Sequence, residues 1–389
     1  MTHASSDRKI VAVNFAAMFE HGIILLLLGP LVPSFMATFA IGESMAGLLL
    51  AAGSVGFVTG LFFAGAVIDR VNVRAALAIG LAVEAAALVL FAIAPAFAVA
   101  LVAGFALRFG ASFIEAGSNV MPTLTAQRRS PHAVMNLVHM FFSVGAFLGP
   151  FLIGLYLEAT GQWRPIMFLT LIPVGLVLAG TLLLRMPRRQ TQHNPAETHP
   201  LSHIGSVFRM KHVVFGAFTL FFYVGAEVGV SSWVVHYLQS VVGLPPVFSA
   251  AGLSILWIAI MIGRLANSLL ANRYSSRSLV TISGIGGALG SVAFLFAGGL
   301  FGTYLALAWI GLCFSGVFPN VMAELNNRHP EKTGSATAVM AMGASLGAGA
   351  AQLFVGFVAE NVSLPAAFVT PVVLQLLLVA SFWLALRAA

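Results

Sequence analysis

Residues 45–95 read MAGLLLAAGSVGFVTGLFFAGAVI, then DRVNVR at 69–74, then AALAIGLAVEAAALVLFAIAP. The two apolar stretches, 45–68 and 75–95, are each long enough to cross a bilayer, because a spanning helix needs about 20 mostly apolar residues. Only the short connection between them gathers several charges. This pattern predicts two membrane-spanning helices joined by a polar loop.

The same pattern continues in both directions along the chain. Of the 389 residues, 59% are hydrophobic and only 8% are charged, whereas a soluble domain carries roughly 25% charged residues. A surface this poor in charge must face lipid, so the sequence predicts an all-α membrane protein of twelve transmembrane helices. The expected spans are 10–36, 45–68, 75–95, 97–126, 132–158, 165–184, 212–240, 247–271, 277–298, 301–326, 334–359 and 365–386.

The long polar stretch at 185–211 contains Pro and His residues and is interpreted as a linker. It divides the chain into an N-terminal six-helix bundle (1–184) and a C-terminal six-helix bundle (212–389).

The basic residues indicate the orientation. Of the 19 Lys and Arg residues, all but Arg108, Arg164 and Arg264 fall in alternate connections or at the two ends. The positive-inside rule then places both termini and the linker in the cytoplasm, with the chain in the cell (inner) membrane. The net charge of +7 is therefore a topology signal, and no nucleic-acid partner is expected.

The two halves share four short motifs in the same helix order, which predicts an internal parallel repeat. The offsets between matching motifs are 203, 201, 198 and 207 residues. The matches pair 69–74 with 272–277, 119–121 with 320–322, 145–149 with 343–347, and 20–22 with 227–229. Parallel halves of this kind place a substrate site near the middle of the membrane, between them.

These motifs carry a family resemblance. The segment Gly65-x-x-x-Asp69-Arg70-x-x-x-Arg74 resembles the signature loop of the major facilitator superfamily, and Gly263-Arg264 with Arg273-x-x-x-Arg277 resembles its echo in the second half. The resemblance implies the major facilitator fold and transport by alternating access. It also implies a gating role, through charge contacts that hold one access state, for Asp69, Arg70, Arg74, Arg264, Arg273 and Arg277.

Three further segments are similar to the fucose/glucose–proton symporters within that superfamily. They are Tyr223–Leu238 (YVGAEVGVSSWVVHYL), Glu115-x-Gly117-x-Asn119 and Asn136-Leu137-x-His139. This similarity implies that the substrate is a small polar solute such as a monosaccharide, carried together with protons. In one respect the chain departs from the pattern, because Gly29 stands where those symporters carry an aspartate.

Ionisable residues inside the spans are site candidates, since a charge at the bilayer centre costs about 2.5–3.5 kcal/mol on insertion scales. Arg108, Ser112, Glu115 and Asn119 form one polar stripe on the 97–126 span. Arg108 and Glu115 are about 10 Å apart along the helix axis, so each is expected to have a partner on another helix. Glu115 is the leading proton-coupling candidate.

Glu20 and Glu227 are the other proton-coupling candidates, and the repeat pairs them with each other. Glu20 and His21 are neighbours that point about 100° apart on a helix, so they cannot face the same spot. Glu84 lies in no motif and is interpreted as a structural carboxyl. The substrate-binding candidates are Arg108, Asn119, Asn136, His139, Trp233, His236 and Asn320.

Several chemistries are excluded by the sequence. No GxxxxGK[ST] loop is present, so ATP does not drive the protein, and neither metal-ligand spacing nor a hydrolase-like triad stands out. A single cysteine, Cys313, excludes a disulfide framework. No enzyme activity, catalytic residue, cofactor or metal is expected.

The sequence leaves alternatives open. The chain could be a proton-antiport exporter of amphipathic or cationic compounds, a carrier of an organic anion bound by Arg108, or a receptor or lipid-handling protein on the same scaffold. Sodium coupling also stays open. The expected partners are a small-molecule substrate, protons and the lipid bilayer, and a monomer suffices for the mechanism.

Overall fold

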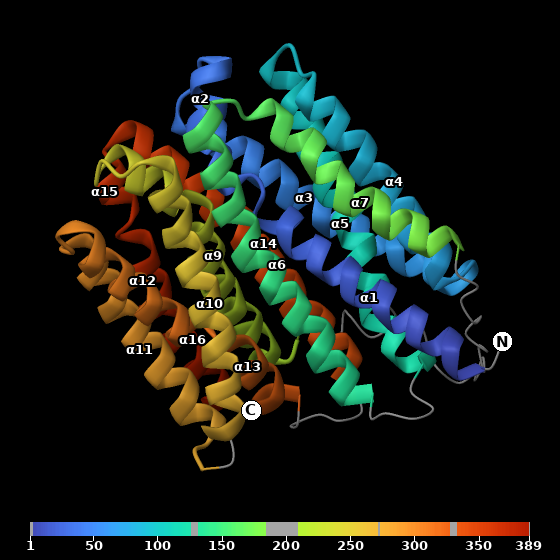
Figure 1. The fold of residues 1–389 in the computed structure, drawn as a ribbon. Helices are drawn as coiled ribbons and strands as arrows, with labels where there is room; N and C mark the ends of the chain where they lie inside the picture. Colours follow the sequence, from blue (N-terminus) through green and yellow to red (C-terminus); the bar gives the residue numbers. More distant parts are fainter. Residues whose placement is uncertain (1–2, 126–130, 184–208, 271–272, 327–332, 389) are drawn as a thin grey trace. The chain divides into compact units, whose positions relative to one another are not determined.

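The computed structural model describes residues 3–125, 131–183, 209–270, 273–326 and 333–388, and its ribbon is shown in Figure 1. Within these ranges, the side chains of 3–8, 123–125, 131–133, 136, 326 and 333–335 are not described. The described part contains helices and no strand. It holds twelve helical segments long and apolar enough to cross a membrane. The fold prediction is thereby confirmed, while most of the expected linker at 185–211 lies outside the described residues.

Seven α-helices and one short 3₁₀ helix form the first half of the described chain. They are α1 (His3–Leu26), η1 (Gly29–Leu31), α2 (Val32–Phe39), α3 (Glu43–Arg70), α4 (Val73–Ala92), α5 (Phe97–Thr125), α6 (Pro131–Thr160) and α7 (Arg164–Leu183). The second half contains α9 (Lys211–Ser240), α10 (Pro246–Leu270), α11 (Ser276–Leu295), α12 (Gly299–Phe314), α13 (Val317–Asn326), α14 (Thr333–Asn361), α15 (Leu364–Ala367) and α16 (Thr370–Arg387).

The chain divides into two compact units. Unit 1 comprises Met1–Thr191 with Pro245–Ser254, and unit 2 comprises Gln192–Leu244 with Ile255–Ala389. In unit 1, α5 packs against α1, α3 and α4, and α6 packs against α1. In unit 2, α9 packs against α14 and α16.

Three of the expected spans are interrupted. The first is α1 followed by η1 and α2, because Pro30 has no backbone N–H and α1 ends at Leu26. The tenth divides into α12 and α13 around Ser315 and Gly316, and the twelfth into α15 and α16 just before Pro371. The sequence predicts continuous helices at these places, because the stretch around each break is still apolar overall and hydropathy measures only how apolar a stretch is.

Repeated glycines set the closest helix contacts in each unit. A Cβ atom on Gly145 of α6 would overlap the backbone carbonyl oxygen of Phe19 on α1. In unit 2, a Cβ on Gly343 of α14 would overlap the carbonyl oxygen of Ala217 on α9. Small residues let helices approach closely in membranes, so the 145–149 and 343–347 motifs form equivalent crossings.

This equivalence corrects one sequence prediction. Gly145 and Gly343 are 198 residues apart, and so are their partners Phe19 and Ala217. On that register Glu20 corresponds to Phe218, and Glu227 corresponds to Gly29. The predicted pairing of Glu20 with Glu227 is therefore wrong, because a short E-x-G match can arise without equivalent packing.

Candidate functional site

A hydrogen-bonded pair between α1 and α5 lies among the polar residues of unit 1. The His21 Nε2 atom is 3.0 Å from the Glu115 Oε2 atom. The His21 side chain is fully buried, whereas 38% of the Glu115 side chain is exposed. The pair thus joins a fully buried imidazole to a partly exposed carboxylate.

Arg108 lies on the same helix as Glu115 but binds elsewhere. Its Nη1 atom donates to the Leu25 carbonyl oxygen at 3.4 Å, and its Cζ atom lies 5.3 Å from the centre of the Phe57 ring. The interruption after Leu26 explains the first contact, since the last carbonyls of a helix lack helical donors and attract a cation. The prediction that Arg108 and Glu115 each have a partner on another helix is confirmed.

Two fully buried carboxyl groups lie deeper in the bundle. Glu20 on α1 and Glu84 on α4 are both 0% exposed, and their side chains interact with each other. Their carboxyl oxygens accept no other hydrogen bond from the described residues. Glu84 packs on Gly110 of α5, where a Cβ would lie 2.8 Å from the Glu84 Cγ atom.

The remaining residues of the α5 stripe divide between different surroundings. Ser112 is fully buried. It lies against Gly60 of α3, where a Cβ atom would overlap the Ser112 hydroxyl. This hydroxyl donates to the Phe109 carbonyl oxygen at 2.6 Å. Asn119 is half-buried, and its Oδ1 atom is buried without a hydrogen-bond partner among the described residues.

On α6, His139 is half-buried and interacts electrostatically with Glu115. Of the predicted substrate-binding residues in unit 1, Arg108 and His139 therefore both interact electrostatically with Glu115. The side chain of Asn136 lies outside the described residues.

In unit 2, Glu227 is the main buried acid. It interacts with the Tyr223 hydroxyl and with the cation Arg264 of α10, and the Tyr223 hydroxyl donates to the Phe314 carbonyl oxygen at 3.0 Å. Only 9% of Glu227 is exposed. This is a second acid–base cluster, and it is less accessible than Glu115.

Trp233 and His236 are packed inside unit 2. Trp233 is fully buried, and its indole Nε1 donates to the Gln352 carbonyl oxygen at 3.3 Å. The His236 Nδ1 atom lies 3.3 Å from the Ser240 hydroxyl. The Trp233 ring therefore offers no open face for a sugar in this structure. Asn320 is half-buried on α13.

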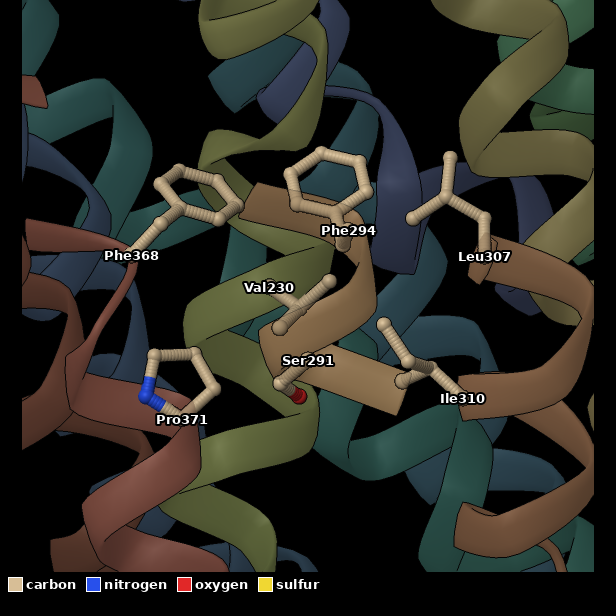
Figure 2. Close-up of a pocket in the computed structure, with 7 residues that line it drawn as sticks. All are labelled: Val230, Ser291, Phe294, Leu307, Ile310, Phe368 and Pro371. Carbon is tan, nitrogen blue, oxygen red and sulfur yellow. The ribbon is translucent and has the colours of Figure 1, made fainter. Parts of the chain in front are cut away.

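A small apolar pocket in unit 2 is also too restricted for a solute. Figure 2 shows Ser291 and Phe294 of α11 with Leu307 and Ile310 of α12 around it. The pocket has no space for a water molecule. The Ser291 hydroxyl, which is its one polar group, already accepts a hydrogen bond from Gln375 Nε2 at 2.9 Å.

Two of the predicted gating residues are bound within their own unit. The Arg74 guanidinium donates to the carbonyl oxygens of Thr181, at 3.1 Å, and of Leu182 in the last turn of α7. Arg277 Nε donates to Glu324 Oε1 at 3.2 Å. The side chains of Asp69, Arg70, Arg264 and Arg273 are exposed.

Sequence reasoning missed the role of His21, Phe57 and Glu84 in these clusters. His21 meets Glu115 across 94 residues of sequence, and no local motif marks such a contact. The available signal was a polar residue at membrane depth in an apolar span, which is uncommon enough to indicate function. Among the described residues, no group of three His, Cys, Asp or Glu side chains could hold a metal.

Several proteins with glucose/galactose transporter names are similar to this chain at low sequence identity. A Helicobacter pylori (strain J99) protein that carries a provisional glucose/galactose transporter name is 28% identical over 352 residues, 84% of this chain and 83% of that protein. The protein of the same provisional name from Helicobacter pylori strain 26695 is also 28% identical, but the alignment covers only 61% of that protein's length. A glucose/galactose transporter of Brucella abortus (strain 2308) is 25% identical, covering 80% of this chain and 78% of that one.

Solved structures share the fold. The nucleoside transporter NupG superposes with a TM-score of 0.82 at 15% identity, covering 98% of this chain and 99% of that one. The E. coli fucose:proton symporter FucP superposes with a TM-score of 0.65 at 20% identity, covering 99% of each chain. The family model of the Major Facilitator Superfamily matches residues 10–351, which confirms the resemblance found in the sequence. The chain is a multi-pass membrane protein that belongs to the Major Facilitator Superfamily.

Proposed function

We propose that this protein is a secondary transporter that carries a monosaccharide together with a proton, with Glu115 as the coupling carboxyl. The observation that carries the proposal is the His21–Glu115 pair, in which a partly exposed carboxylate is held by a buried imidazole. A carboxyl at membrane depth can take up a proton or accept hydrogen bonds from sugar hydroxyls.

The surroundings of Glu115 suit a polar, uncharged solute. Arg108 supplies donors, the Phe57 ring supplies an apolar face, and the break after Leu26 brings the end of α1 next to them. Discontinuous helices often line transporter sites. The sugar transporter names of the relatives and the proton symporter of known structure support the same assignment.

An organic anion is a weaker fit for this site. Arg108 already interacts with two carboxyl groups of its own unit, those of Glu84 and Glu115. Its charge is therefore compensated inside the protein, and an anionic substrate would have to displace one of these acids.

The orientation and organisation are also part of the proposal. Both termini and the 185–211 linker face the cytoplasm of the cell (inner) membrane, and 1–184 and 212–389 act as two six-helix bundles that work by alternating access in a single chain. The basic residues of alternate connections support this orientation, and reporter fusions at each end would test it.

Transport into proteoliposomes tests the function. Uptake of radiolabelled glucose, galactose and fucose is measured with and without an inward pH gradient, for the wild type, Glu115→Gln and the exposed control Glu158→Gln. We expect gradient-driven accumulation in the wild type and the control, and only equilibration in Glu115→Gln with sugar counterflow retained. No uptake of any hexose would refute the sugar assignment, and an organic acid and a cationic dye in the same assay would test the other substrates.

A further inference from the structure

Glu20 and Glu84 are the most deeply buried acids of unit 1, and the proposed mechanism leaves both unused. Neither is exposed at all, and Glu84 lies midway along α4, eleven residues from its first residue. Their oxygens have no hydrogen-bond partner among the described residues beyond the interaction between the two side chains. A purely structural carboxyl would normally be satisfied by surrounding donors, because buried polar groups are usually hydrogen-bonded.

The charges around the pair do not balance if every acid is ionised. Arg108 is the permanent cation that interacts with Glu84 and Glu115, so it cannot offset three carboxylates. Ionised carboxyls without a counter-charge cost several kcal/mol at such depth, and one of two adjacent carboxyls therefore stays protonated. The groups of α1, α5 and α6 that enter this balance are Glu20, His21, Arg108, Glu115 and His139.

Among the described residues of the remaining helices, the other charged groups lie at helix ends or bind elsewhere, as Arg74 at the start of α4 does by donating to the Thr181 carbonyl oxygen. On α3, which packs on α4, the described charged residues Glu43, Asp69 and Arg70 lie at the two helix ends. Arg164 is the first residue of α7 and donates to the carbonyl oxygens of Ala92 and Ala94, at the end of α4 and eight or more residues after Glu84. Arg108 is therefore the permanent cation that can stabilise the pair when one of its carboxyls is ionised.

We propose that Glu20 and Glu84 form a carboxyl pair that binds a coupling proton, and that Arg108, which interacts with Glu84, stabilises the pair once this proton has left. In the sugar-loaded state both carboxyls of the pair are protonated and Glu115 holds its own proton. After the sugar has left on the other side of the membrane, Arg108 stabilises one ionised carboxylate of the pair, and the pair's proton leaves on that same side. The inference rests on the proposed symport and adds a second proton site to it.

Transport stoichiometry tests the pair. Each coupling proton multiplies the limiting accumulation of sugar by about ten for each unit of pH gradient, since 1.4 kcal/mol corresponds to a factor of ten. We expect Glu84→Gln and Glu20→Gln each to lower the accumulation ratio about tenfold, with counterflow within about twofold of the wild type. Glu158→Gln is the control and should keep the full ratio. Accumulation equal to the wild type in both variants would overturn the proposal.

A second measurement does not depend on the transported solute. Infrared spectra of the reconstituted protein at neutral pH should contain the C=O stretching band of a protonated carboxyl, reduced in Glu84→Gln and in Glu20→Gln and unchanged in Glu158→Gln. An unchanged band in both pair variants would refute the pair. If the wild type accumulates no sugar but the band behaves as expected, the symport proposal fails and the proton site stands.

Discussion

Replacing Gly145 with Ala should weaken unit 1 at the crossing of α1 and α6. The new Cβ would overlap the carbonyl oxygen of Phe19 and lie 2.9 Å from its carbonyl carbon. These are backbone atoms that cannot rotate aside, so the helices must move apart. Overpacking costs typically 1–3 kcal/mol, and Ala gains up to about 1 kcal/mol over Gly in a helix.

Because the overlap is with backbone atoms, the cost lies at the upper end of this range, and after the helix-propensity gain the net loss at Gly145 is about 2 kcal/mol. For a unit of this size that corresponds to an apparent Tm about 4–8 °C lower. The assay is thermal unfolding of the purified protein in detergent, followed by circular dichroism at one fixed heating rate, because membrane proteins often unfold irreversibly.

Two matched variants make the test specific. A Cβ on Gly175 of α7 would meet nothing within 4 Å, so Gly175→Ala should leave the Tm unchanged or raise it slightly. Gly343→Ala at the equivalent crossing of unit 2 should lower it as Gly145→Ala does, because it meets the Ala217 carbonyl. If Gly145→Ala is as stable as Gly175→Ala, the helices are not held by glycine contact and the repeat register drawn from it is wrong.

Two further outcomes follow from the site geometry. His21→Phe should raise the KM for sugar counterflow about fivefold, because Phe has no donor and the hydrogen bond to the partly exposed Glu115 carboxylate is lost, a loss of about 1 kcal/mol. An unchanged KM beside the Glu158→Gln control would argue against His21 as the residue that positions Glu115. Trp233→Phe should lower the Tm by a few degrees through loss of the indole bond to Gln352 and leave KM within about twofold of the wild type. A large rise in KM with an unchanged Tm would restore Trp233 as a sugar-stacking residue.

The helices were predictable because hydropathy depends only on which residues are near in sequence. Apolar runs bounded by charge predict the spans within a few residues, and the break at Pro30 is visible as a proline in the sequence although its consequence is not. Spacing also predicts that Arg108 and Glu115 have separate partners, since helix geometry fixes their distance along the axis.

The partners themselves could not be read from the chain. His21 and Glu115 meet because α1 packs against α5, and Glu84 on α4 interacts with Glu20 on α1 across 64 residues of sequence. Each contact joins residues that are tens of positions apart and belong to no shared motif. Glu84 was interpreted as structural for this reason, although its burial without other partners argues for a titrating role.

The corrected repeat also bears on where proton chemistry resides. The glycine crossings are duplicated between the units, so duplication preserved the packing of α1 on α6 and of α9 on α14. The buried acids were not duplicated with it, because Glu20 corresponds to Phe218 and Glu227 to Gly29. A function that required matched acids in both units would have kept them in register. The differing residues instead favour a division of work, in which unit 1 carries the proton through Glu115, Glu20 and Glu84, and the acid of unit 2, with Tyr223 and Arg264 beside it, serves another purpose.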